Sequence, residues 1–166
     1  MVDADFCFTY IDVGGNGRAS DRAIFRDCTL NISMENNTLG MPENSVVIVG
    51  DDALPLRTNL MKPYSKTGLS NYERIFNYRL SRARRVVENA FGILVWRFVI
   101  FSGPIELKPD TTDKVIFAAC SLHNWLRKTS ANTYLSPQAV DRFSIPAILF
   151  RENGGNIWTL YNLLIV

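Results

Sequence analysis

The chain has 166 residues, of which 47% are hydrophobic and 20% charged, and this composition predicts one folded domain rather than a disordered polymer. Its formal net charge is only +2, so total charge alone indicates no nucleic-acid or membrane partner. Its three cysteines are widely spaced and form no CxxC pair, which predicts reduced core residues in an intracellular protein. No apolar run approaches the roughly 18 residues that span a bilayer, and no signal peptide is evident, so we expect neither membrane insertion nor secretion.

The front of the chain is expected to alternate strands and helices. Residues 5–13 are rich in aromatic and β-branched side chains, which predicts a strand, and the glycine-rich segment 14–17 ends it in a turn. Ser20 is suited to cap a helix that follows, and its inward-facing side chains are expected to be Ala23, Ile24 and Leu30. The β-branched run 46–49 predicts a second strand, buried on both faces, that ends in Gly-Asp-Asp.

The clearest helix is predicted over residues 70–98. Ser70 and Glu73 have the spacing of a capping box, and apolar residues then recur at helical intervals. The large side chains expected to be buried are Phe76, Leu80, Val87, Phe91 and Leu94.

A further helix is expected to begin at Thr111 or Thr112, with its inward side chains including Ile116, Leu122 and Leu126. Residues 130–166 mix proline and glycine with short apolar runs, and they predict no definite element. The order of strands and helices as a whole indicates an α/β fold.

Positive charge is concentrated in the helix predicted over 70–98, which holds six basic and two acidic residues. This predicts either a phosphate-facing helix or an ordinary solvated basic face. Glu88 lies at the edge of the expected apolar stripe, roughly 40° from Arg84 and about 60° from Arg85 on a helical wheel. Arg84 and Glu88 therefore have the spacing of an ordinary i,i+4 ion pair, and a functional role for Glu88 requires a second carboxylate.

Asp51 supplies that second carboxylate, because functional groups in open α/β sheets gather at the carboxyl ends of strands. One of Asp51 and Asp52 is expected to point inward. Hard divalent cations such as Mg²⁺ prefer carboxylate oxygens, and two such ions can clamp the attacking and leaving oxygens of a phosphodiester. The alternative is an aspartate that only caps the loop after the strand.

Several segments are recognisable as sequence motifs. These are Val-Gly-Asp-Asp-Ala-Leu-Pro-Leu (49–56), Leu-Met-Lys-Pro-Tyr (60–64), the block 73–94, Leu-His-Asn-Trp-Leu-Arg (122–127) and Gly-Asn-Gly-Arg-Ala-Ser-Asp (15–21). From about residue 3 to about residue 141, the chain resembles the PIF/Harbinger transposases and their domesticated nuclease relatives. The resemblance implies an RNase H-like DDE nuclease fold whose three acids bind two divalent metal ions, Mg²⁺ or Mn²⁺, and cut DNA to leave a 3′ hydroxyl.

Matched residue by residue, the family's second acid falls on Asp51 and its third on Glu88. The resemblance also favours Arg82, Arg84 and Arg85 as contacts to DNA phosphates, because arginine binds phosphate oxygens bidentately.

The family's first acid, which lies in an Asp-Gly-x-His type segment on the first strand, has no match in this chain. Asp12 and Asp21 match other family segments. We therefore expect residues 1–129 to form an N-terminally truncated nuclease domain with an unpaired strand edge at 5–13, which does not cut DNA by itself. The family pattern is lost near residue 142, so 130–166 is interpreted as a divergent tail.

Two rival hypotheses follow. The first is a non-catalytic DNA- or protein-binding remnant that uses the basic helix 70–98, with a Myb-like DNA-binding protein as the partner that the resemblance implies. The second is a decayed gene product without a selected function. The resemblance implies a location in the nucleus, with the cytoplasm as a further possibility, and His123 is expected to be a hydrogen-bonded core residue rather than a ligand.

Overall fold

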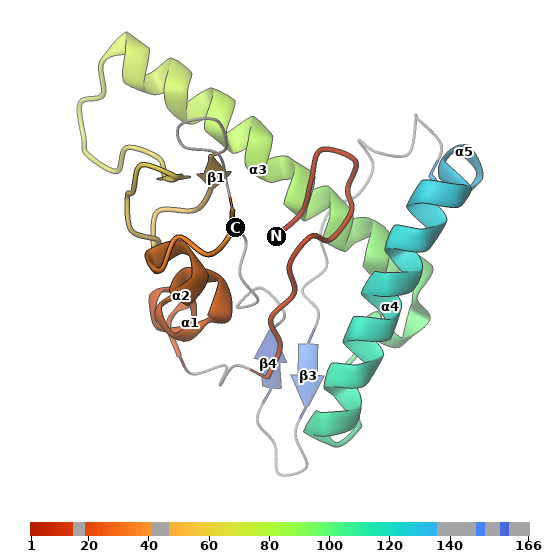
Figure 1. Ribbon diagram of the computed structural model, residues 1–166. Coiled ribbons are helices and arrows are strands. Elements are labelled where there is room, and N and C mark those ends of the chain that lie inside the picture. Colours follow the sequence, from red (N-terminus) through yellow and green to blue (C-terminus); the bar gives the residue numbers. More distant parts are fainter. Residues whose placement is uncertain (15–18, 41–46, 136–148, 152–156, 160–166) are drawn as a thin grey trace.

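The computed structural model describes residues 1–14, 19–40, 47–135, 149–151 and 157–159. It has a mixed α/β structure that is mostly helical. The elements in chain order are α1 (Asp21–Asp27), α2 (Thr29–Glu35), β1 (Ile48–Val49), β2 (Leu60–Met61), α3 (Asn71–Arg97), the 3-10 helix η1 (Val99–Phe101), α4 (Pro109–Thr129), α5 (Ala131–Tyr134), β3 (Leu149–Arg151) and β4 (Ile157–Thr159). Helix α3 runs diagonally across the view of Figure 1, with α1 and α2 at the left of the molecule and α4 at the right, near the C-terminal half of α3.

The prediction of a strand over residues 5–13 is wrong. The Asp3 carboxylate accepts hydrogen bonds from the backbone N–H groups of Asp5 and Cys7, both at 2.9 Å. Phe6 has a φ of 63°, so the chain doubles back, and only an isolated bridge forms between residues 2 and 8. A local turn therefore replaces the strand and its expected unpaired edge.

The backbone of Phe8 is held by a side chain rather than by a neighbouring strand. Its N–H donates to Oδ1 of Asn124 at 2.8 Å, and its carbonyl accepts from Nδ2 of the same residue at 2.8 Å. Because Asn124 lies on α4, this pair of bonds joins the N-terminal segment to that helix. The asparagine satisfies the two peptide groups that a strand would otherwise pair.

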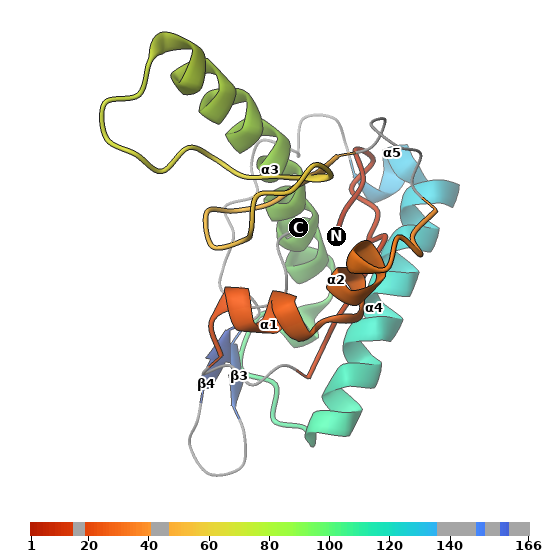
Figure 2. The same ribbon diagram turned by 60° about the vertical axis from the view of Figure 1, so that its left-hand side comes forward.

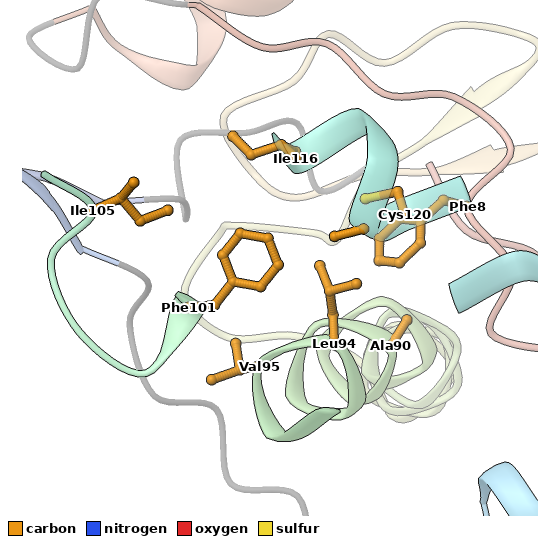
Figure 3. Close-up of a cluster of buried hydrophobic side chains, with 9 residues drawn as sticks. Phe8, Ala90, Leu94, Val95, Phe101, Ile105, Ile116 and Cys120 are labelled. Atoms are coloured by element: carbon orange, nitrogen blue, oxygen red, sulfur yellow. The ribbon is translucent and has the colours of Figure 1, made fainter. Parts of the chain in front are cut away.

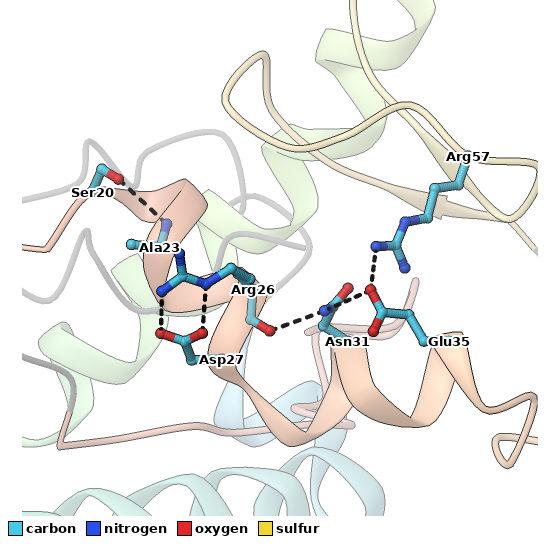
Figure 4. Close-up of polar contacts among 7 residues, drawn as sticks. All are labelled: Ser20, Ala23, Arg26, Asp27, Asn31, Glu35 and Arg57. Carbon is cyan, nitrogen blue, oxygen red and sulfur yellow. Dashed lines mark hydrogen bonds and ion pairs between the residues drawn. The ribbon is translucent and has the colours of Figure 1, made fainter.

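The helix predicted after Ser20 forms, but it is divided in two. The Ser20 hydroxyl accepts from the backbone N–H of Ala23 at 3.3 Å, as Figure 4 shows. At Cys28 the backbone becomes extended, and the Cys28 sulfur then caps α2. Phe25 and Leu30 are buried, whereas Ala23 and Ile24 are only partly buried, so the inward face differs from the prediction at two positions.

Helix α2 is tied to the segment between the first two strands by Glu35. Its Oε1 lies 2.8 Å from Nη2 of Arg57 and accepts from Nδ2 of Asn31 at 3.2 Å (Figure 4). A hydrophobic cluster lies beneath these polar contacts and joins α1 and α2 to both strands through Phe25, Cys28, Leu30, Met34, Ile48, Leu54 and Leu60. This cluster fixes the position of the loop that follows β1.

The predicted strand at 46–49 is shorter in the structure and pairs with a strand that the sequence did not predict. Strand β1 runs parallel to β2, with Ile48 opposite Leu60. Ile48 is buried, but Val47 is 39% exposed, so the prediction of a strand covered on both faces is wrong. At the end of β1 the Gly50 N–H donates to the Met61 carbonyl at 2.8 Å.

The predicted helix over 70–98 is confirmed as the longest helix of the described residues. Ser70 and Glu73 form the complete capping box. Of the side chains expected to be buried, Leu80, Val87 and Leu94 are buried, while Phe76 and Phe91 are only partly buried. Leu94 belongs to the main core between α3 and α4 (Figure 3), whose buried members are Phe8, Ala90, Leu94, Val95, Phe101, Ile105, Ile116, Ala119 and Cys120.

Helix α4 begins earlier than predicted. Pro109 is its first residue, since the fixed φ of proline and its missing N–H suit the first position of a helix. Ile116 is buried as expected, but Leu122 is 49% exposed and points away from the core. The part of the chain without a predicted element contains α5 and the antiparallel pair of β3 and β4.

Some expectations fall on residues outside the described ranges. These are the turn at 15–17, the first residue of the strand predicted at 46–49, and the change of pattern near residue 142. The cysteines are within the described ranges, and all three are buried and unbridged, as expected for reduced core residues.

Candidate nuclease site

Asp51 is the inward-facing member of the aspartate pair at the end of β1. It is half-buried, and its Oδ1 accepts from the Ala53 N–H at 2.9 Å. Asp52 is exposed, and its Oδ1 lies 3.4 Å from Nζ of Lys62. The loop-capping role and a ligand role are compatible in Asp51, because its Oδ2 makes no hydrogen bond within the described part of the chain.

A second carboxylate lies close to Asp51. Burial raises the pKa of Asp21, the first residue of α1, and the negative charge of Asp51 raises it further. The two carboxylates therefore repel each other. Sequence reasoning considered Asp21 but did not count it as a metal ligand, because it matches a family segment other than the one that holds the first acid.

Glu88 is half-buried on α3 and has no hydrogen bond or ion pair within the described residues. Arg84, one turn earlier, is also half-buried, and its Nε is buried without a hydrogen-bond partner. The ordinary ion pair that their spacing suggested is thus not formed in the structure. Both side chains keep their capacity to bind a charged ligand.

The three arginines proposed for DNA do not share one face of α3. Arg82 and Arg85 are exposed, while Arg84 lies toward the body of the molecule beside Glu88. On a helical wheel Arg82 is roughly 120° from Glu88 and Arg85 about 60° from it. Arg84 and Arg85 therefore flank Glu88, and Arg82 faces away from it.

Helix α3 packs against β1, so the strand end that carries Asp51 and the helix that carries Glu88 are neighbours (Figure 1). Within the described ranges, however, no group of three His, Cys, Asp or Glu side chains is assembled at the spacing of a metal site. The sharing of one ion by Asp51 and Glu88 stays a prediction.

His123 is confirmed as a core residue. Its side chain is fully buried, with Nε2 at 2.7 Å from the Phe6 carbonyl and Nδ1 at 2.9 Å from the Tyr134 hydroxyl. Because a carbonyl only accepts, Nε2 carries the proton and Nδ1 accepts from Tyr134. Burial lowers the pKa of His123, which keeps the ring neutral.

Carboxylate oxygens such as those of Asp51 and Glu88 are the ligands that hard divalent cations prefer. The sequence model of the DDE superfamily endonucleases matches residues 1–124, and the chain belongs to this family. This match confirms the resemblance drawn from the motifs. None of the helices in the described ranges has the length and apolar character needed to cross a membrane.

Protein ALP1-like from Arabidopsis thaliana is 28% identical to the chain, over 75% of this chain and 33% of its own length. The chain thus spans about a third of the length of this curated relative. No solved structure matches the chain.

Proposed function

We propose that the chain carries the second and third acids of a metal-dependent DNA endonuclease with an RNase H-like fold. Asp51 and Glu88 would hold a divalent cation, Mg²⁺ or Mn²⁺, and this proposal rests on the contact of α3 with β1. It is further supported by the Oδ2 of Asp51 and the carboxylate of Glu88, neither of which has a hydrogen-bond or ion-pair partner among the described residues.

The donor set fits such a cation. Carboxylate oxygens are the ligands that hard divalent ions prefer, and Asp21 lies near enough to Asp51 that the charge of Asp51 adds to the burial that raises the pKa of Asp21. When bound, the ion would stabilise the charge that develops on the scissile phosphate. The chain's own groups would orient the reaction, since the Ala53 N–H fixes Asp51 and the half-buried guanidinium group of Arg84, one turn from Glu88, can donate to a phosphate oxygen.

We propose that this chain alone does not cut DNA. Its sequence contains no Asp-Gly-x-His segment to supply the family's first acid. Two acids can hold one ion loosely, but they cannot fix a pair of ions in line with the scissile bond.

A binding function without cleavage is the second candidate. It is favoured by the guanidinium groups of Arg82, Arg84 and Arg85, none of which forms an ion pair with a described residue, so that they can contact DNA phosphates whether or not the acids are complete. A Myb-like partner protein and a nuclear location belong to this proposal as they do to the first. DNA binding that survives Glu88→Gln but weakens steeply with salt would favour it.

A plasmid-nicking assay tests the nuclease proposal. The 166-residue chain should produce no nicks in Mg²⁺ or Mn²⁺, whereas fusion to an upstream segment with an Asp-Gly-x-His acid should produce metal-dependent nicking. Glu88→Gln should abolish that activity, and the matched change Asp52→Asn should retain it, because Asp52 is exposed and held by Lys62. Nicking by the chain alone that disappears in Asp51→Asn would contradict the proposed inactivity.

A further inference from the structure

The first half of α3 presents an exposed face that combines aromatic and basic side chains. Three large hydrophobic residues on it are unusually open to solvent, with Tyr72 86%, Ile75 50% and Tyr78 63% exposed. Four exposed arginines lie among them, namely Arg74, Arg79, Arg82 and Arg85. On a helical wheel all seven fall within roughly 160°, and we call this surface the outer face of α3.

The outer face carries positive charge without any acid. None of the four guanidinium groups forms a hydrogen bond or an ion pair with a described residue. Other cations at the surface are paired, as in Arg26 with Asp27 and Lys66 with Glu73. Glu73 is held by Lys66 and Ser70 on a different side of the helix, so it does not neutralise the outer face.

This half of α3 projects from the rest of the molecule, and the segment that precedes it runs outward along one side to the start of the helix (Figure 2). That segment is joined to the helix by Asn77, whose amide bonds the Tyr64 N–H and carbonyl at 2.9 Å each. The Tyr64 ring also packs edge-on against Phe76, 5.3 Å between centroids. These contacts cover the side of Phe76 and Asn77 and leave the outer face open.

We propose that the outer face binds single-stranded DNA, with phosphates on the arginines and bases stacked on Tyr72 and Tyr78. A duplex could use the arginines, but its bases are already stacked and would not need exposed rings. Sequence-tolerant binding of single strands combines this kind of basic surface with aromatic platforms. From Arg74 to Arg85 the helix extends about 16 Å, the length of roughly five stacked nucleotides at the spacing of about 3.4 Å found along one strand of a duplex.

The outer face of α3 does not include Asp51 or Glu88. The proposal of single-strand binding rests on the proposed nuclease function only in taking DNA as the ligand. A strand held here would lie outside the cleavage site, beside the helix that carries Glu88. Binding should therefore need no metal ion.

The test is fluorescence anisotropy of a labelled 20-nucleotide oligothymidylate with the full chain in EDTA, beside a duplex of equal length. Arg74→Gln with Arg79→Gln should weaken binding at least about tenfold and lower the salt slope by about 1.4, because each phosphate contact contributes about 0.7. Tyr72→Ala with Tyr78→Ala should weaken single-strand binding at least about tenfold but duplex binding less than about twofold.

Arg26→Gln is the control for loss of a positive charge elsewhere on the surface, because it makes the same substitution at an exposed arginine that is already paired with Asp27. It should bind as the unmodified chain does, and circular dichroism should show the same helix content in every variant. The proposal would be overturned if both double variants bound single-stranded DNA as tightly as the unmodified chain, or if the tyrosine changes weakened duplex and single-strand binding equally. It would also be overturned if polyglutamate competed for the surface as well as single-stranded DNA does. Glu88→Gln should leave single-strand binding unchanged, so failure here is distinguishable from failure of the metal site.

Discussion

Two asparagines in this chain make the same pair of backbone hydrogen bonds in different surroundings. Asn124 bonds the Phe8 N–H and carbonyl at 2.8 Å in a part-buried setting, and Asn77 bonds the Tyr64 N–H and carbonyl at 2.9 Å in an exposed one. Replacing either residue with alanine removes two hydrogen bonds of equal geometry. The difference between the two losses measures what burial adds.

The expected magnitudes differ because water can replace only one of the two lost pairs. A net loss of about 0.5–1.5 kcal/mol per bond, together with peptide groups left unsatisfied near the core, gives roughly 2–4 kcal/mol for Asn124→Ala. At Asn77 solvent can satisfy the released groups, so Asn77→Ala should lower the free energy of unfolding by less than about 1 kcal/mol. The N-terminal segment should also detach from α4 in the first variant alone.

Urea unfolding followed by far-UV circular dichroism measures both losses, and hydrogen exchange at the Phe8 amide reports the local contact. Asn124→Ala should expose that amide to rapid exchange, while Asn77→Ala should leave it protected. Equal losses of stability in the two variants, or an unchanged Phe8 exchange rate in Asn124→Ala, would refute the reasoning that a side chain replaces a strand at this position.

Three further outcomes are expected. Leu94→Ala should lower the free energy of unfolding by roughly 2–5 kcal/mol, since Leu94 is fully buried. Leu122→Ala should lower it by less than about 1 kcal/mol, because Leu122 is 49% exposed. Similar losses of stability for the two variants in urea titrations would count against the described core. Ser70→Ala should cost about 1 kcal/mol by removing the cap of α3, and an unchanged melting temperature would show that the cap does not matter. Because burial holds the pKa of His123 below its ordinary 6.5, the unfolded chain binds the proton more readily, so stability should fall as pH drops below about 6.5. His123→Gln should flatten this pH dependence of the melting temperature, and an equally steep dependence in that variant would argue against a buried neutral ring.

The sequence predicted α3 well because the signals there are local. The capping box of Ser70 and Glu73 and the helical recurrence of apolar residues both lie within the helix itself. The prediction of a strand at 5–13 was wrong because the conformation of this segment depends on groups outside it. An alternating pattern cannot reveal that Asn124, far along the chain, satisfies the Phe8 backbone, or that Asp3 stabilises a turn.

The candidate site was likewise predictable only where its signals are local. The position of Asp51 after a strand follows from the short β-branched run, and the structure gives it the inward orientation expected of one of the two aspartates. The closeness of Asp21 depends on how α1 packs on the first two strands, which no local pattern encodes. The missing ion pair between Arg84 and Glu88 is a matter of side-chain conformation, and i,i+4 spacing predicts only that such a pair can form.

The central claim, that Asp51 and Glu88 share one divalent ion, is tested most directly by Mn²⁺ titration followed by electron paramagnetic resonance. The account predicts that Asp51→Asn and Glu88→Gln each weaken binding by at least about tenfold, roughly 1.4 kcal/mol, and that the double variant is scarcely weaker than either single one. Asp52→Asn should bind as the unmodified chain does. Unchanged Mn²⁺ affinity in Glu88→Gln, with affinity lost in Asp51→Asn, would contradict the shared site.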